Sequence, residues 1–290
     1  MTTSAPARHT VPGSAGLRLA ALGDRAVLHD LYDETGSAVY HDLSAQDTLE
    51  VRELLGRVRT VPGPVLELAA GSGRLTFPLL ALGRDVTALE LSSGMLALLR
   101  QRLDEAPARI RNRCTTVHGD MSDFRLEGTF GAVVLGTTSI SLLDAAGRAG
   151  LYEAVRGHLA PGGRFLLSTV ERPADEAEGT DGSDGTDGAD GTEGADDTEV
   201  VLDVVGASGR GYRMHEHWPA GADARVITVF PAEEPASGTV PVATSTVGVL
   251  PVARLTAELA AHGLTVTARY PLPSGGWRHR DVLLEAEVAA

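Results

Sequence analysis

The strongest constraint on the fold is the short apolar run 65–68 (VLEL), which ends in the turn 69–74 (AAGSGR). The run predicts a buried parallel strand, and the two glycines of the turn let the backbone bend sharply and approach a ligand closely. Glu90 follows nineteen residues after the first of these glycines and ends a second apolar run, 86–89. A carboxylate at that strand end can accept both hydrogen bonds of a ribose diol. Together these features predict a site for a nucleotide-like ligand.

A dinucleotide-binding fingerprint is the main competing interpretation of this turn. That fingerprint requires G-x-G-x-x-G, but Thr76 occupies the position of the third glycine. The chain also contains no lysine, and all 25 basic residues are arginine. A P-loop and lysine-dependent Schiff-base chemistry are therefore excluded.

Three further segments follow in order along the chain. They are 117–121 (VHGDM), 130–138 (FGAVVLGTT) and 159–163 (LAPGG). With the first turn and Glu90, they resemble the motif series of class I S-adenosylmethionine (SAM) methyltransferases over about residues 60–170. The resemblance implies an α/β, Rossmann-like, doubly wound sheet of seven strands, here with an inserted antiparallel β cap. An unrelated α/β domain whose glycines only form turns is the alternative.

The resemblance also implies SAM as the cofactor and S-adenosyl-L-homocysteine (SAH) as the product. The residues implied for the methionine end are Glu67, Ala69, Gly71 and Gly73. Glu90 would hold the ribose, and Leu91 and Met121 would sandwich the adenine. Asp120 would accept a hydrogen bond from its exocyclic amine. Plain core packing is an equally good interpretation of Met121, because methionine commonly fills gaps. The other cofactor-binding residues implied are Ser72, Met95, Gly136 and Thr137.

Two tyrosines, Tyr32 and Tyr40, lie eight residues apart before the first of these strands. This spacing resembles the N-terminal lid of small-molecule N-methyltransferases, including sugar-amine N,N-dimethyltransferases. The resemblance implies that both tyrosines close over the cofactor and that Tyr32 also takes part in catalysis. Two half-buried tyrosines that pack a surface helix onto the sheet are the alternative.

Four runs of alternating character, 200–205, 211–218, 224–230 and 240–249, predict an inserted antiparallel sheet. Strand alternation in the second run puts His215 and His217 on one face and Glu216 on the other. An amine acceptor must lose its proton before methyl transfer, so we expect His217 to face the substrate as the candidate base. A structural histidine is a close alternative. A metal ligand ranks last because no third ligand lies near, and we expect no metal site.

The segment after the fourth strand, 135–141 (LGTTSIS), lacks the Asn/Asp-Pro-Pro-aromatic clamp of amide and base N-methyltransferases. An aliphatic amine or a hydroxyl is therefore the expected acceptor. Nucleic acid is disfavoured because no basic stripe accompanies aromatic residues. The run 131–144, the tyrosine segment and the long cap are similar to methyltransferases of daptide-type ribosomal peptide biosynthesis, which implies a C-terminal peptide amine. Open alternatives are an amino-sugar or small-metabolite amine, and a SAM-binding protein without catalysis.

Charge and composition set the remaining boundaries. The formal net charge is −14, but residues 171–199 carry twelve acids and one arginine, which leaves −3 for the rest. This Asp-Gly repeat predicts disorder, and its spacing does not fit a calcium-binding loop. The single Cys114 predicts a buried, inert thiol and a reducing cytoplasm. We expect no membrane segment and a possible homodimer. The expected parts are a flexible N-terminus (1–23), lid helices (24–60), a SAM-binding core (61–170), the acidic repeat (171–199), the β cap (200–250) and a last helix with two strands (251–290).

Overall fold

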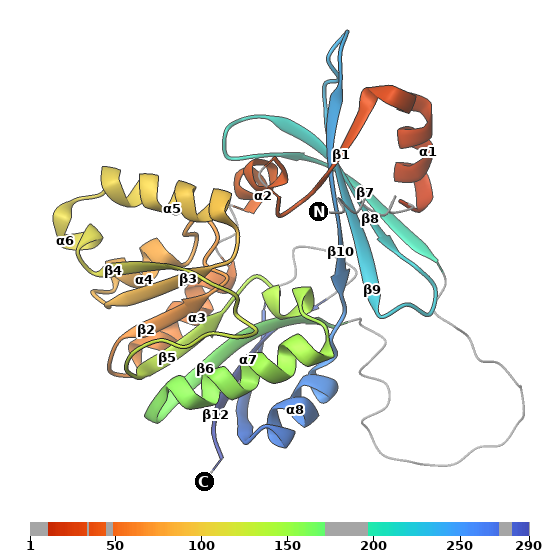
Figure 1. Ribbon diagram of the computed structural model, residues 1–290. Coiled ribbons are helices and arrows are strands. Elements are labelled where there is room, and N and C mark those ends of the chain that lie inside the picture. The colour runs from red at the N-terminus through yellow and green to blue at the C-terminus, as the bar shows by residue number, and fades with distance from the viewer. Residues whose placement is uncertain (1–10, 34, 45–48, 172–196, 273–279, 290) are drawn as a thin grey trace, which may run out of the picture. The chain divides into compact units, whose positions relative to one another are not determined.

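A computed structural model describes residues 11–33, 35–44, 49–171, 197–272 and 280–289 (Figure 1). The chain forms two compact units, and each unit combines segments that are distant in sequence. The smaller unit comprises Met1–Leu43 and Gly191–Val247, and the larger unit comprises Ser44–Asp190 and Gly248–Ala290. No helix among the described residues is long and apolar enough to cross a membrane.

The larger unit contains a seven-stranded sheet in the order β11-β12-β6-β5-β2-β3-β4. The strands are β2 (Val65–Leu68), β3 (Val86–Glu90), β4 (Cys114–His118), β5 (Phe130–Leu135), β6 (Leu159–Glu171), β11 (Leu264–Pro271) and β12 (Arg280–Val288). The pairs β2–β3, β3–β4, β2–β5 and β5–β6 are parallel, whereas β12 is antiparallel to both β6 and β11. The predicted seven-stranded α/β fold and the antiparallel last pair are confirmed.

Helices cover both faces of this sheet, as a doubly wound arrangement requires. They are α3 (Leu49–Arg59), α4 (Thr76–Ala81), α5 (Ser93–Glu105), α6 (Ala108–Arg111), α7 (Ala145–His158) and α8 (Val252–Ala261), with the 3₁₀ helix η2 (Ser139–Leu142) after β5. One hydrophobic core packs α3, α4 and α5 against the sheet. The other core packs α7 and α8 against the opposite face.

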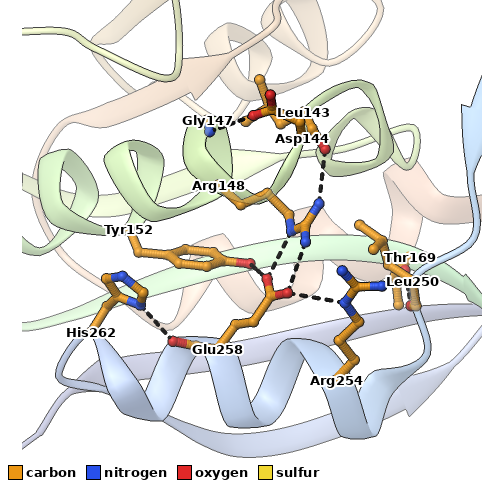
Figure 2. A network of polar contacts seen from close by, with 10 residues as sticks. All are labelled: Leu143, Asp144, Gly147, Arg148, Tyr152, Thr169, Leu250, Arg254, Glu258 and His262. Carbon is orange, nitrogen blue, oxygen red and sulfur yellow. Dashed lines mark hydrogen bonds and ion pairs between the residues drawn. The ribbon is translucent and has the colours of Figure 1, made fainter.

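A partly buried polar network connects α8 to α7 in the larger unit (Figure 2). The Arg148 guanidinium, 3% exposed, contacts both carboxylate oxygens of Glu258, at 2.7 and 2.8 Å, and donates to the Leu143 carbonyl at 2.9 Å. The Tyr152 hydroxyl also donates to Glu258, at 3.1 Å. Hydrogen bonding to Arg148 holds the pKa of Glu258 down at about 2. The pair therefore stays charged and ties two helices together.

The smaller unit is built on a five-stranded sheet in the order β1-β10-β9-β8-β7. Its elements are α1 (Gly13–Leu22), the 3₁₀ helix η1 (Gly23–Arg25), β1 (Ala26–Asp30), α2 (Gly36–Ser44), β7 (Thr198–Val205), β8 (Gly211–Trp218), β9 (Ala224–Pro231) and β10 (Val240–Gly248). One face packs Phe230, Val240 and Val242 against Ala15 of α1. The other face packs Tyr212 and Val229 with residues of α2.

The N-terminal part of the chain differs from its sequence-based description. Residues 13–22 were expected within a flexible N-terminus but form α1, because Ala15 and its neighbours have apolar partners on the five-stranded sheet. Residues 26–30 were expected among lid helices but form β1, which pairs in parallel with β10. The acidic segment 172–196 lies outside the described residues, and β6 and β7 extend to its two ends at Glu171 and Thr198.

Candidate functional site

The candidate ligand turn follows β2, where residues 69–74 are held by a carboxylate from the neighbouring strand. Glu90, at the end of β3, accepts a hydrogen bond from the Gly71 N–H at 2.7 Å and one from the Ser92 N–H at 2.7 Å. The Glu90 side chain is largely buried, with the residue 8% exposed. Ser92 then caps α5 by accepting from the Met95 N–H at 3.4 Å. Glu90, which lies nineteen residues after Gly71 in the sequence, is thus in direct contact with the turn in the structure.

The turn has a backbone conformation that constrains its residues. Ala69, Gly71 and Gly73 all have positive φ, at 51°, 57° and 93°. A Cβ on Gly73 would lie 2.6 Å from Leu99 Cδ1, so α5 packs directly onto this glycine. Strained, left-handed backbone at a strand end commonly marks a functional site. Ser72 in the same turn is buried, and its carbonyl accepts from Arg102.

Glu67 supplies a buried carboxyl group directly before the turn. It is 2% exposed, and its Oε2 accepts a hydrogen bond from the Thr76 hydroxyl at 2.5 Å. Burial raises the pKa of Glu67 to about 8. A cation beside this carboxyl group, such as the ammonium group of an amino acid, would favour its ionised form and lower that pKa.

The end of β4 holds the residues expected around an adenine. Asp120 is exposed, and its Oδ1 accepts from the Ser122 N–H at 2.8 Å and from the Ser122 hydroxyl at 2.7 Å. Met121 is buried in the core that also contains Leu89, so this side chain packs in the core as one of the two interpretations predicted. Leu91 is 59% exposed and leaves an apolar side chain uncovered at the end of β3, whereas Met95 is buried in α5.

The exit from β5 completes this edge of the larger sheet. Thr137 has a φ of 56°, and its N–H donates to Glu50 Oε1 at 2.7 Å. Glu50 is 6% exposed and also pairs with Arg74 of the turn. Sequence reasoning missed Glu50, because α3 also carries Glu53, which pairs with Arg57 at the surface, and nothing in the sequence separates the two acids. A Cβ on Gly136 would lie 2.5 Å from Leu75 Cδ1.

The two predicted tyrosines lie together in the smaller unit. The rings of Tyr32 and Tyr40 have centroids 5.3 Å apart and are tilted by 55°. Burial raises the pKa of Tyr32, while the positive charge of Arg225 acts in the opposite direction. Arg225 forms a buried ion pair with Glu216 of β8. We call these four residues the tyrosine face.

His217 lies on the opposite face of the same strand. Its Nε2 is 2.9 Å from Asp197 Oδ1, and a Cβ on Gly13 at the start of α1 would lie 2.7 Å from its Nδ1. His215 contacts Ser14 of α1 through a 2.9 Å hydrogen bond, and burial lowers its pKa. The predicted alternation is therefore present, but the histidine face packs against α1. Glu216 lies on the tyrosine face instead, and a substrate-facing role for His217 stays a prediction.

The remaining chemistry-bearing groups are structural. Cys114 on β4 is partly buried, and burial raises the pKa of its thiol to about 12, the reverse of what a nucleophilic thiol needs. Within the described ranges, no group of three or more His, Cys, Asp or Glu residues is arranged to hold a metal ion.

Comparison with known proteins decides the family. A methyltransferase-domain family model matches residues 65–163, which contain the turn, Glu90 and the exits of β4 and β5. The crystal structure of the glycopeptide N-methyltransferase MtfA in complex with SAM is 40% identical to this chain, covers 97% of it and 99% of its own length, and superposes with a TM-score of 0.66. The chain belongs to the class I SAM-dependent methyltransferase family.

Curated members of this methyltransferase family match shorter parts of the chain. An rRNA adenine N-6-methyltransferase from Corynebacterium diphtheriae is 32% identical over 95 residues, which is 33% of this chain. A dTDP-3-amino-3,6-dideoxy-alpha-D-glucopyranose N,N-dimethyltransferase from Streptomyces fradiae is 31% identical over 157 residues, which is 53% of this chain. The chain spans 35% and 56% of the length of these two relatives.

The residues of the methyltransferase site fit SAM. The left-handed turn leaves room for a ligand where a side chain on Gly71 would meet no atom within 4 Å. The protonatable Glu67 lies at the start of the turn, and Glu90 presents a carboxylate at the next strand end. Solved relatives hold SAM, sinefungin and SAH. SAM is therefore the cofactor, as the sequence predicted.

Proposed function

We propose that this protein is an N-methyltransferase that transfers the methyl group of SAM to an aliphatic amine carried by a peptide. The observation that supports this best is the extent of the match to MtfA, a glycopeptide N-methyltransferase, which covers nearly the whole of both chains. That match includes the smaller unit, whereas the methyltransferase-domain model stops at residue 163. A relative that aligns over the whole chain supports an acceptor class better than a match to the methyltransferase domain alone.

The chain's residues have defined tasks in this proposal. SAM supplies an activated methyl group, so the protein positions a lone pair and excludes water. We propose that Glu67 and the turn hold the methionine end, that Glu90 holds the ribose, and that Leu91 and Asp120 contact the adenine. Glu67 lies directly before the turn, and an ammonium group beside it would favour its ionised form and lower its raised pKa.

The acceptor's nitrogen must be neutral when it reacts, because a protonated amine has no free lone pair. We propose that the tyrosine face receives this group. Glu216, 3% exposed, adds a buried carboxylate to this face beside the Arg225 guanidinium, and we propose that it helps to orient the amine. Tyr32 and Tyr40 add aromatic surface for the cofactor or the acceptor.

A second acceptor class has its own support. The Streptomyces fradiae relative methylates a dTDP-amino sugar, according to its name, and shares 157 aligned residues with this chain. The daptide-type acceptor, a C-terminal peptide amine, is the narrowest form of the peptide proposal. It rests on the resemblance carried by residues 131–144, the tyrosine segment and the long cap.

The test is intact-mass analysis after incubation with SAM and a panel of amines. The panel contains a glycopeptide with a free primary amine, a peptide that ends in 1,2-diaminopropane, and dTDP-3-amino-3,6-dideoxyglucose. A gain of one or two methyl masses on either peptide, absent with Glu90→Ala, supports the proposal. A gain on the dTDP-amino sugar alone would show that the acceptor is an amino sugar rather than a peptide. SAM binding without any gain on the panel contradicts both acceptor classes.

A further inference from the structure

The exit from β5, Gly136–Thr138, is held in an unfavourable backbone conformation. Thr137 and Thr138 are consecutive β-branched residues with φ of 56° and 54°, in the left-handed region that such residues rarely adopt. Strain of this kind persists only where the surroundings impose it, and it clusters at functional sites. The contacts around the β5 exit therefore show what the fold is holding in place.

Two side chains impose the conformation by taking the backbone N–H groups. The Thr137 N–H donates to Glu50 Oε1 at 2.7 Å, and the Thr138 N–H donates to the hydroxyl of Ser168 on β6 at 2.9 Å. Gly136 packs so closely that an added Cβ would lie 3.1 Å from the same Glu50 oxygen. The Glu50 carboxylate thus lies directly against the β5 exit.

The second oxygen of the same carboxylate contacts the ligand turn. Glu50 Oε2 pairs with the Arg74 guanidinium, and the two side chains are only 7% and 12% exposed. Arg74 ends the turn whose Gly71 N–H is held by Glu90. One buried carboxylate therefore joins the end of β2 to the end of β5, although α3, which carries it, precedes both strands in sequence.

We propose that Glu50 is a positioning residue that couples cofactor binding at the turn 69–74 to the shape of the β5 exit. A ligand that orders the turn fixes Arg74, Arg74 fixes Glu50, and Glu50 fixes the Thr137 amide. The β5 exit lies at the carboxyl edge of the parallel strands, where sheets of this kind bind their ligands. The proposal rests on the proposed SAM chemistry, and it adds a residue that orders the acceptor side once the cofactor is bound.

The test is hydrogen–deuterium exchange of the full-length protein with and without SAH, followed at residues 136–143. In the wild type we expect SAH to slow exchange at the Thr137 amide. Glu50→Ala should exchange about tenfold faster there, as expected for the loss of one buried hydrogen bond, and SAH should no longer slow it. Glu50→Gln keeps an oxygen for the amide but no charge for Arg74. It should keep the slow basal exchange and lose the effect of SAH.

Glu53→Gln is the matched control, because Glu53 lies on the same helix and pairs at the surface with Arg57. It should behave as the wild type. An SAH effect that persists in Glu50→Gln, or that is absent from a wild type that binds SAH, overturns the coupling. Failure of the wild type to bind SAH overturns the proposed function itself, so the two failures are distinguishable.

Discussion

The two units of this protein place their functional residues in different ways. In the larger unit the candidate residues follow consecutive parallel strands, each one at a carboxyl end, and those ends meet at one edge of the sheet. In the smaller unit the tyrosine face combines Tyr32 and Tyr40 with Glu216 and Arg225, almost two hundred residues further along the chain. The first arrangement follows from the fold itself, whereas the second depends on how two distant segments pair.

The family match follows the same division. Residues 65–163, which the methyltransferase-domain model recognises, belong entirely to the larger unit. The larger unit therefore carries what the family shares, and we infer that the smaller unit carries what distinguishes one acceptor from another. Changes in the larger unit should affect stability and SAM binding, and changes on the tyrosine face should affect turnover.

The largest effect should come from the polar network between α7 and α8. Arg148→Ala removes two charge-assisted hydrogen bonds to Glu258 and one to the Leu143 carbonyl, and it should lower the free energy of unfolding of the larger unit by about 3 kcal/mol. Urea denaturation measures this loss. Arg254→Ala, which removes a half-exposed contact to the same carboxylate, is the control and should cost under about 1 kcal/mol. Equal losses would show that the Arg148–Glu258 contact contributes no more to stability than the Arg254–Glu258 contact does.

Glu90→Ala should next weaken SAH binding by about 100-fold, because it removes the carboxylate that orders the turn and that we propose holds the ribose. Isothermal titration calorimetry with SAH measures the change. Glu105→Ala at the exposed end of α5 serves as control and should bind SAH as the wild type does. An unchanged SAH affinity in Glu90→Ala would show that Glu90 does not take part in cofactor binding.

A smaller effect should separate the two faces of β8. Glu216→Gln should lower kcat about tenfold without changing SAH affinity, because it removes the carboxylate from the tyrosine face. His217→Asn should leave kcat within about threefold, because His217 packs against α1. Initial rates on the accepted amine measure both variants. The reverse order of effects would return His217 to the acceptor site.

The last effect, small over any one pH unit, is the pH dependence contributed by Glu67. Burial raises its pKa from 4.5 to about 8, so the folded state binds a proton that the unfolded chain releases between these values. Stability should therefore fall as the pH rises from about 5 to 8, by at most about 1.4 kcal/mol per pH unit. Urea denaturation across this range should show a flatter profile for Glu67→Gln. Identical profiles would show that Glu67 does not bind that proton.

The larger unit could be predicted in detail because its signals are local. An apolar run followed by a glycine turn or an acid defines each strand end, and the order of these ends along the chain gives the sheet. The sequence predicted that the turn 69–74 and Glu90 serve one ligand, and the structure brings them into direct contact. Glu50 could not be predicted, since a buried carboxylate on an amphipathic helix looks like any other acid in the sequence.

The smaller unit shows where sequence reasoning stops. The alternation of side chains along β8 correctly placed His217 and Glu216 on opposite faces, but this alternation does not indicate which face packs against α1. The strand β1 was missed because it is short and lies at a sheet edge. Its partner β10 is about two hundred residues away and pairs with it in parallel. A parallel pairing between two strands so far apart has no signal in the local sequence.

That pairing also sets an order of assembly during synthesis. The strand β1 finds its neighbour only when β10, ending at Gly248, has been made, so the segment with Tyr32 and Tyr40 leaves the ribosome long before its sheet can form. The strands β2 to β6 of the larger unit are complete by Glu171, earlier in synthesis. A nascent chain released before residue 248 would therefore carry the residues proposed to contact SAM but lack the complete sheet that supports the surface proposed to receive the amine.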